Sequence, residues 1–354
     1  MYSNSVLRVA VAAALASAFV SVASAQETRV EEVIVTSTAL RENPLEVAQP
    51  TEVVSGDELR RQVAASLGET LGGELGVSST YFGPSASQPV IRGLGDYRVQ
   101  ILQDGAAALD VSSLSQDHAV SIESVVAQQI EIIKGPAALL YGSGAAGGLV
   151  NVVTTRIPSK LPETFGGALE LRADSAMEER TGAASIDGGF GILGFHADYF
   201  DRQTEDAEIP GFAQSPILRR ELAEESSDVR GTLPNSASDS RGGALGASVV
   251  GDAGFAGVAW NRYESVYGIP AEETAFIDMQ QDRTDAKGQW RAAGPWLDVL
   301  HASVAHSDYT HTEFEAPGVP GTIFEQDAYE LRIAADHHWN SKWRGTMGAQ
   351  YVDT

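Results

Sequence analysis

The chain has 354 residues, with 24 basic and 48 acidic side chains, a net charge of −24 and no cysteine. The negative charge argues against nucleic acid as a partner, because carboxylates repel phosphates. The absence of cysteine excludes disulfide frameworks, thiolate metal sites and thiol nucleophiles. Any metal must therefore be bound by His, Asp or Glu.

The first 25 residues differ from the rest of the chain. Arg8 precedes a run of small and apolar residues that ends in Ala23-Ser24-Ala25. This pattern predicts a secretory signal peptide over residues 1–25, with Gln26 as the first mature residue. A buried helix is the alternative, but it does not explain the small-residue end.

The mature N-terminus carries a short β-branched run between polar residues. Its members are Glu32, Val33, Ile34, Val35, Thr36 and Ser37. Such a run is either an edge strand of the next domain or a segment that pairs with the sheet edge of another protein. Taken alone, the residues leave both readings open.

Residues 44–158 have the pattern of an α+β domain. Two short helices are expected after Ser55 and Ser66, and short β-branched runs follow as strands, at 88–92, 99–102, 130–133 and 149–155. The glycine run at 142–147 matches G-x-G-x-x-G, but a strand-like run follows it where a dinucleotide site needs a helix. A tight glycine turn is therefore expected there.

From residue 159 onward, amphipathic strands are joined alternately by tight turns and by long polar connections. Strands are expected at 164–174, 180–190, 192–202, 241–251, 253–263, 276–292, 295–310, 323–339 and 342–354, and the long connections at 203–240, 264–275 and 311–322. Long loops at one end and tight turns at the other are typical of a bacterial outer-membrane β-barrel. A soluble β-sandwich would also show alternation, but with shorter strands.

Nine strands do not close a bacterial barrel, which needs an even number; barrels with a filled lumen use about 22. We therefore expect the chain to be a fragment of a longer protein.

An ordered set of motifs resembles the TonB-dependent outer-membrane receptors. Its residues include Arg92, Gly93, Asp104, Gly105, Gly135, Pro136, Tyr141, Gly142, Gly147 and Gly148. The resemblance implies an α+β plug domain, residues 44–158, followed by the N-terminal part of an antiparallel transmembrane β-barrel, residues 159–354. It also implies that residues 26–43 hold the TonB box, with Glu32 to Ser37 binding TonB and its inner-membrane energising complex.

Asp117 and His118 are the first candidate metal ligands, because a carboxylate and an imidazole presented together by a loop can bind zinc. The segments 47–50, 66–69, 79–84, 115–119 and 311–315 are similar to the zinc-uptake branch of these receptors. In that branch a plug Asp-His pair binds zinc with barrel Glu and His residues. The match here is Asp117 and His118. Glu313 and Glu315 lie on one strand face near an expected loop and could complete a site with this pair. Ordinary alternatives are a hydrogen-bonded loop histidine and solvated rim carboxylates.

Two observations speak against a metal site. Residues 203–240 contain no histidine, whereas zinc-type receptors often have His-rich loops. The remaining histidines do not form a site by spacing either: His301 and His311 share a strand face but lie about 33 Å apart.

Three functions remain open. The first is an energised receptor for zinc or a metal chelate, in which zinc is cargo and not a cofactor. The second is the same architecture serving a siderophore, haem, cobalamin or an oligosaccharide. The third is a passive outer-membrane porin or adhesin. An enzyme is not expected, because no catalytic motif such as H-E-x-x-H is present.

Overall fold

The computed structural model describes residues 49–354 except 136–140, 223–228, 293, 295 and 341–342. The expected signal peptide and the expected TonB-binding residues 32–37 lie outside the described residues. Among the described residues, no helix is both long enough and apolar enough to cross a membrane.

Residues 49–158 form an α+β module around a five-stranded sheet of order β1-β6-β7-β4-β5. Its pairings are antiparallel except for β4 with β7, which is parallel. The strands are β1 (Thr51–Ser55), β4 (Val99–Gln103), β5 (Ala106–Ala107), β6 (Gln129–Lys134) and β7 (Gly148–Val153). A separate antiparallel pair joins β2 (Val77–Ser79) and β3 (Pro89–Ile91).

Two short helices, α2 (Gly56–Gln62) and α3 (Leu67–Leu71), precede β2. The side chain of Ser66 caps α3 by accepting a hydrogen bond from the backbone nitrogen of Glu69, 3.3 Å away, as the Ser-x-x-Glu spacing predicts. Three short 3-10 helices complete the module: η1 (Asp96–Arg98), η2 (Ser124–Val126) and η3 (Ser143–Ala145). Because strand β7 follows η3 directly, the expected glycine turn is confirmed.

The core of the module is aliphatic. Side chains of α2 and α3 pack with those of β6 and β7, and each of the following is at most 3% exposed: Leu59, Leu67, Leu71, Ile130, Ile132, Val150 and Val152. Full burial of a side chain of this size contributes about 1.5–3 kcal/mol. Buried Glu131 of β6 and Asn151 of β7 interrupt these aliphatic strands and hydrogen-bond to each other.

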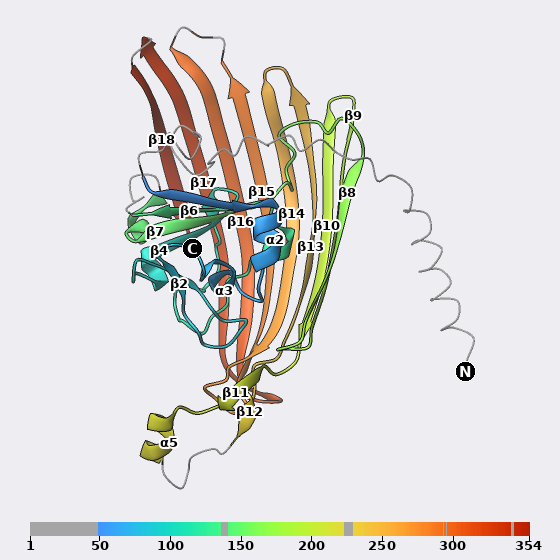
Figure 1. The fold of residues 1–354 in the computed structure, drawn as a ribbon. Coiled ribbons are helices and arrows are strands. Elements are labelled where there is room, and N and C mark those ends of the chain that lie inside the picture. Colours follow the sequence, from blue (N-terminus) through green and yellow to red (C-terminus); the bar gives the residue numbers. More distant parts are fainter. Residues whose placement is uncertain (1–48, 136–140, 223–228, 293, 295, 341–342) are drawn as a thin grey trace, which may run out of the picture. The chain divides into compact units, whose positions relative to one another are not determined.

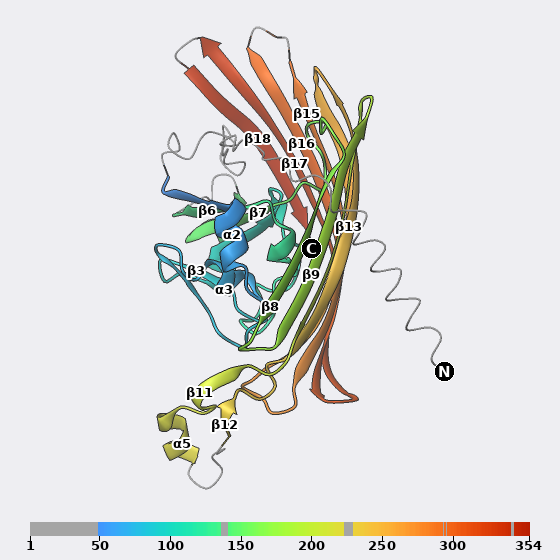
Figure 2. The ribbon, with the colours of Figure 1, turned by 45° about the vertical axis from the view of Figure 1, so that its right-hand side comes forward.

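A second, nine-stranded antiparallel sheet covers residues 166–353, and its strands follow one another in chain order (Figure 1). They are β8 (Gly166–Asp174), β9 (Glu179–Phe190), β10 (Leu193–Thr204), β13 (Ser238–Gly251), β14 (Gly254–Gly268), β15 (Phe276–Arg291), β16 (Leu297–Ala316), β17 (Val319–Asn340) and β18 (Trp343–Asp353). The strands curve along their length (Figure 2). The connection from β10 to β13 contains β11 (Glu208–Phe212), α5 (Pro216–Leu222) and β12 (Arg230–Thr232).

The nine strands expected from the alternation are all present. The expected long connection at 311–322 is wrong, however, because β16 continues to Ala316 and β17 begins at Val319. Only residues 317 and 318 lie between them, and Gly318 takes the positive φ of 78° that this tight turn needs. The polar composition of 311–322 thus belongs to strand ends and not to a loop.

One face of the large sheet, called the outer face, exposes aromatic side chains at two levels. Phe190, Trp290, Trp339 and Trp343 lie near the tight turns, and Tyr199, Trp260, Tyr329 and Tyr351 lie toward the long loops; each is at least 43% exposed. Tyr329 and Trp339 are ten residues apart on β17, which spans about 25 Å along the membrane normal for a strand tilted by about 40°. This separation matches the apolar band of an outer-membrane barrel.

The opposite, inner face contacts the α+β module through polar groups. The buried guanidinium of Arg202 on β10 donates to Glu123, with Nη2 2.7 Å from Oε1. Ser121 donates to Oε1 of Gln281 on β15 over 2.8 Å, and a carboxylate oxygen of Glu330 on β17 accepts from the backbone nitrogen of Ala107 over 2.7 Å. The module therefore makes polar contacts with at least three strands of the large sheet, β10, β15 and β17.

Candidate metal centre

Two side chains of the large sheet meet one side chain of the α+β module near the C-terminal end of β16. His118 lies between β5 and η2, in a segment of the module that contacts the inner face. His311 and Glu313 are two residues apart on β16 and therefore project from the same side of the strand. The centre is thus divided between two parts of the chain that lie almost 200 residues apart in sequence.

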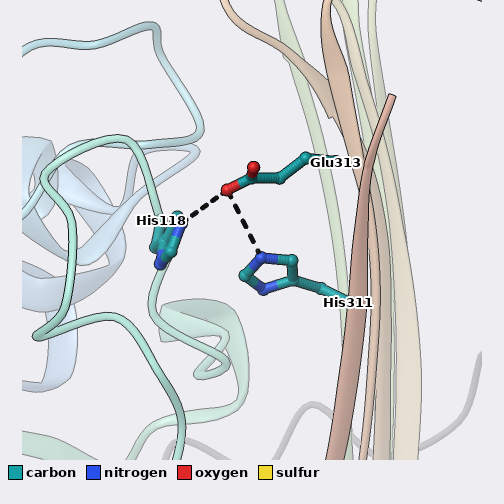
Figure 3. A group of neighbouring side chains, drawn as sticks. All are labelled: His118, His311 and Glu313. Atoms are coloured by element: carbon teal, nitrogen blue, oxygen red, sulfur yellow. Dashed lines mark hydrogen bonds and ion pairs between the residues drawn. The ribbon is translucent and has the colours of Figure 1, made fainter. Parts of the chain in front are cut away.

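The three side chains converge on one carboxylate oxygen (Figure 3). Oε1 of Glu313 lies 3.0 Å from Nε2 of His118 and 3.7 Å from Nε2 of His311. The centroids of the two imidazole rings are 4.6 Å apart. One ligating atom from each residue lies within 4.8 Å of the other two, so a single ion between them can reach all three.

The two histidines are closed off from solvent, whereas the carboxylate is not. His118 is 2% exposed and His311 is 0% exposed, while the Glu313 side chain keeps 32% exposure. The ring of Phe324 on β17 packs against both imidazoles, with centroid distances of 5.2 Å to His118 and 4.6 Å to His311. Glu313 is therefore the member of the cluster that solvent can reach.

The hydrogen bonds of His118 leave its Nε2 suited to a cation. Nδ1 lies 3.1 Å from the carbonyl oxygen of Val111, which can only accept, so Nδ1 carries the proton. In the neutral ring Nε2 then presents a lone pair to a carboxylate oxygen 3.0 Å away. Two acceptors at that distance need a proton or a metal ion between them. Carbonyl oxygens commonly orient zinc-binding histidines in this way.

His311 has a similar arrangement. Its Nδ1 lies 2.8 Å from the hydroxyl of Tyr309 on the same strand. Its Nε2 is buried and has no hydrogen-bond partner among the described residues. Buried polar atoms are usually satisfied, so a ring nitrogen without a hydrogen bond, 3.7 Å from a carboxylate oxygen, is available to a cation.

The segment that carries His118 is held in a compact loop. Asp110 opens it with an Asx turn, accepting from the backbone nitrogen and the hydroxyl of Ser112, and its second oxygen accepts from Ser121 at the far end. Inside the loop, Nε2 of Gln88 lies 2.8 Å from the carbonyl oxygen of His118 and 2.7 Å from that of Ser112. The loop therefore presents its histidine in a fixed place.

The structure brings two of the four candidate metal ligands together and leaves two outside. His118 and Glu313 belong to the cluster. The carboxylate of Asp117 accepts a hydrogen bond from Ser115, and Glu315 is exposed beyond the cluster. The ligand roles of all four stay predictions.

His311 is the residue that sequence reasoning missed. Spacing along the sequence relates only histidines of the same strand. The histidine that lies beside His311 in space is His118, which belongs to the α+β module. Two signals pointed to it: the resemblance of segment 311–315 to the zinc-uptake branch, and the pattern His311-Thr312-Glu313, which places two ligand types on one face of one strand.

The remaining motif residues lie in turns of the α+β module. Arg92, Asp104 and the glycines 93, 105, 135, 142 and 148 have positive φ. Gly148 cannot be replaced without displacement, because an added Cβ would lie 2.3 Å from the carbonyl oxygen of Ile133. The carboxylate of Asp104 accepts hydrogen bonds from the backbone nitrogen and the hydroxyl of Thr154. Gly147 directly precedes β7. The ring of Tyr141 stacks under the guanidinium of Arg332. Pro136 lies outside the described residues.

Comparison with known proteins agrees with this architecture. A family profile described as the TonB-dependent receptor plug domain matches residues 43–149. Among solved structures, the copper transporter OprC has a TM-score of 0.66 at 16% identity over 85% of this chain and 45% of its own. A double mutant of the Serratia marcescens hemophore receptor HasR, in complex with its hemophore HasA and heme, has a TM-score of 0.68 at 15% identity, over 87% and 45%.

A third solved structure, the alcaligin outer-membrane receptor FauA from Bordetella pertussis, has a TM-score of 0.61 at 14% identity, over 90% of this chain and 49% of its own. This chain thus spans about half the length of the solved structures it matches. At such low identity the likeness shows a common fold. The family profile shows that the chain contains a TonB-dependent receptor plug domain, and the sheet that follows it shares the fold of the solved structures it matches.

Proposed function

We propose that this protein is a TonB-dependent outer-membrane receptor for the energised uptake of a divalent metal ion, and that the ion is zinc. The observation that carries the proposal is the cluster of His118, His311 and Glu313, in which two imidazole nitrogens and one carboxylate oxygen converge. Because His118 comes from the plug and the other two from the barrel strand β16, an ion bound there would bridge the two parts.

The donor set favours zinc over softer and harder ions. Two nitrogens and one carboxylate oxygen supply three of the four ligands of a tetrahedral zinc site. The chain has no cysteine, so a monovalent copper ion would find no thiolate here, although Met279 is the cross-strand neighbour of His311. Calcium and magnesium prefer sites built from oxygen ligands alone.

The burial of the two histidines favours a bare ion over a chelate. A siderophore, haem or cobalamin needs an open cavity of several hundred cubic ångströms. Here Phe324 and the loop around His118 leave the imidazoles at most 2% exposed. The similar structures are a copper transporter, a hemophore receptor and an alcaligin receptor. A siderophore, haem, cobalamin or an oligosaccharide therefore forms the second hypothesis.

The cargo is tested by calorimetric titration of zinc into the full-length receptor in detergent. We expect one tight site in the wild type and a loss of affinity in His118→Ala and His311→Ala, since each variant removes one of three ligands. The matched control is His338→Ala: His338 lies on the barrel strand β17, 37% exposed and paired with Asp298, outside the cluster. Equal zinc affinity in all four proteins, or tight binding of a ferric chelate instead, would favour the second hypothesis.

The energy for uptake would come from TonB, the inner-membrane partner implied by the plug domain. We propose that residues 32–37 form the TonB box and pair with TonB as an added strand. Replacing Val33 or Val35 with Pro would remove a backbone donor from that strand. Zinc uptake by cells carrying the receptor should stop, while zinc binding to the purified receptor stays unchanged. Unchanged uptake would contradict the TonB box, and a passive porin or adhesin would then be the better account.

A further inference from the structure

The hydroxyl of Tyr267, on barrel strand β14, lies between the two peptide groups that flank the Cα of His118. It accepts a hydrogen bond from the backbone nitrogen of Ala119 over 2.8 Å. It donates to the carbonyl oxygen of Asp117 over 3.1 Å. One hydroxyl thus uses its donor and an acceptor position on the peptides directly before and after the candidate ligand.

These two bonds fix the backbone of His118 from the barrel side. The orientation of a side chain depends on the φ and ψ angles of its residue, and those angles are set by the two peptide planes that Tyr267 holds. The other backbone contacts of His118 come from the plug: its nitrogen bonds to the carbonyl oxygen of Ser115, and its carbonyl accepts from Gln88. Among the described residues, Tyr267 alone ties this backbone to the barrel.

Tyr267 is itself held rigidly. It is 1% exposed and belongs to a buried cluster formed by plug and barrel side chains, which includes Val111, Ala119, Ile277, Met279 and Tyr309. On the sheet its register partner is Ile277 of β15. Because the ring cannot shift without opening this cluster, the hydroxyl is a fixed reference point for the loop.

We propose that Tyr267 is a positioning residue for the metal, acting through the backbone of His118 to align its Nε2 with His311 and Glu313. This inference rests on the proposed function and adds a barrel residue that does not touch the ion. Loss of a partner that orients a metal ligand typically weakens binding about 10–100-fold. Metal affinity therefore depends on the plug loop being docked against β14.

The test compares Tyr267→Phe with Tyr263→Phe in the full-length receptor in detergent. Tyr263 lies four residues earlier on the same strand face, is 7% exposed and belongs to the same buried cluster. Its hydroxyl, however, hydrogen-bonds with the side chains of Ser240 and Ser265. We expect zinc to bind Tyr267→Phe about 10–100-fold more weakly and Tyr263→Phe with unchanged affinity. The visible absorption spectrum of bound cobalt, which reports ligand geometry, should change in the first variant alone.

A double variant separates positioning from general damage to the fold. If Tyr267 acts through His118, then Tyr267→Phe should cause no further loss of affinity in a His118→Ala background. A further loss there would show a merely structural role and overturn the inference, as would unchanged affinity and spectrum in Tyr267→Phe alone. A wild-type protein that binds neither zinc nor cobalt would overturn the proposed function and this inference together. Zinc binding that is insensitive to Tyr267 would overturn this inference only.

Discussion

The interior of the plug is packed mainly by aliphatic side chains, whereas its contact with the barrel combines an apolar cluster with buried charges. The plug core is aliphatic, with Ile130, Ile132, Val150 and Val152 almost fully buried between sheet and helices. The contact with the barrel contains buried charges and hydrogen bonds, such as those between Arg202 and Glu123.

This difference predicts that the plug separates from the barrel more easily than the plug core unfolds. Exposing an apolar core to water costs about 25 cal/mol for each Å². Exposing a polar contact costs less, because water replaces each hydrogen bond and the net contribution of one bond is only about 0.5–1.5 kcal/mol. We therefore expect force on the N-terminus to move the plug against the barrel before it unfolds the plug core.

The largest expected effect comes from separating the two parts. Residues 26–158 should be obtainable as a soluble, folded plug, because their core is complete without the barrel. Residues 161–354 alone should aggregate, since β8 and β18 are the edges of the large sheet and an open edge is unsatisfied in lipid. Circular dichroism and gel filtration check both fragments. A closed, detergent-soluble barrel made from 161–354 would contradict this expectation.

Removing the central charge of the plug–barrel contact should have the next largest effect. Arg202 is 1% exposed and binds Glu123 of the plug and Glu179 of β9, so Arg202→Ala leaves two buried carboxylates without a cation. Such a loss costs about 3–5 kcal/mol. Amide hydrogen exchange of η2 should speed up, while exchange in β6 and β7 stays slow.

The matched control is Arg262→Ala. Arg262 pairs with Asp282 on the outer face, with its side chain 43% exposed, and such a pair contributes about 0–1 kcal/mol. Similar losses of stability in the two arginine variants would mean that the plug–barrel contact does not depend on buried charge.

A cavity in the plug core should destabilise the plug without releasing it. Ile132→Ala removes a fully buried side chain from β6 and should lower the free energy of unfolding of the plug by about 2–5 kcal/mol. Exchange in β6 and β7 should speed up. All five tryptophans lie between residues 260 and 343, so tryptophan fluorescence reports on the barrel alone and should not change. A changed fluorescence would show that core and contact are not independent.

The smallest effect concerns the pH dependence of the plug. Burial raises the pKa of Glu69 in α3 to about 7, from an ordinary value of 4.5. The folded plug therefore favours the protonated carboxyl, and its stability should fall as pH rises from about 4.5 to about 7. The loss is on the order of 2 kcal/mol, since one pKa unit corresponds to about 1.4 kcal/mol and the carboxyl keeps some contact with water.

Glu69→Gln should remove this dependence and stabilise α3 above pH 7. Hydrogen exchange of residues 67–72, corrected for the intrinsic effect of pH, measures it in the full chain. Equal pH dependence in the wild type and the variant would show that the carboxyl is solvated.

The strands were predictable because their signals are local. The period-two alternation of β17, for example, places Tyr329, Leu331 and Ile333 outward and Glu330 inward, and this depends on the strand geometry alone. The Ser66 cap is an equally local signal. The expected loop at 311–322 failed because its polar residues lie on strand ends beyond the apolar band, where composition no longer separates a strand from a loop.

The candidate centre was predictable only in part. His118 and Glu313 were candidates because of a resemblance to known receptors, whereas nothing in the spacing of the histidines pointed to His311 or to the supporting role of Tyr267. Their partners lie 148 to 195 residues away in the sequence. Contacts over such separations depend on how plug and barrel dock, and a single sequence does not encode that docking in any local pattern.

The sequence by itself therefore determined the α+β module, the amphipathic strands and the kinds of ligand available: imidazole and carboxylate, without any thiol. The tertiary structure decided which of the seven histidines meet. The strand register decides that the side chains of His311 and Glu313 lie on the inner face of the sheet. The docking of one plug loop against β14 brings His118 next to them. A ligand set needs atoms within a few ångströms of one another, and only the folded chain brings residues from two domains that close.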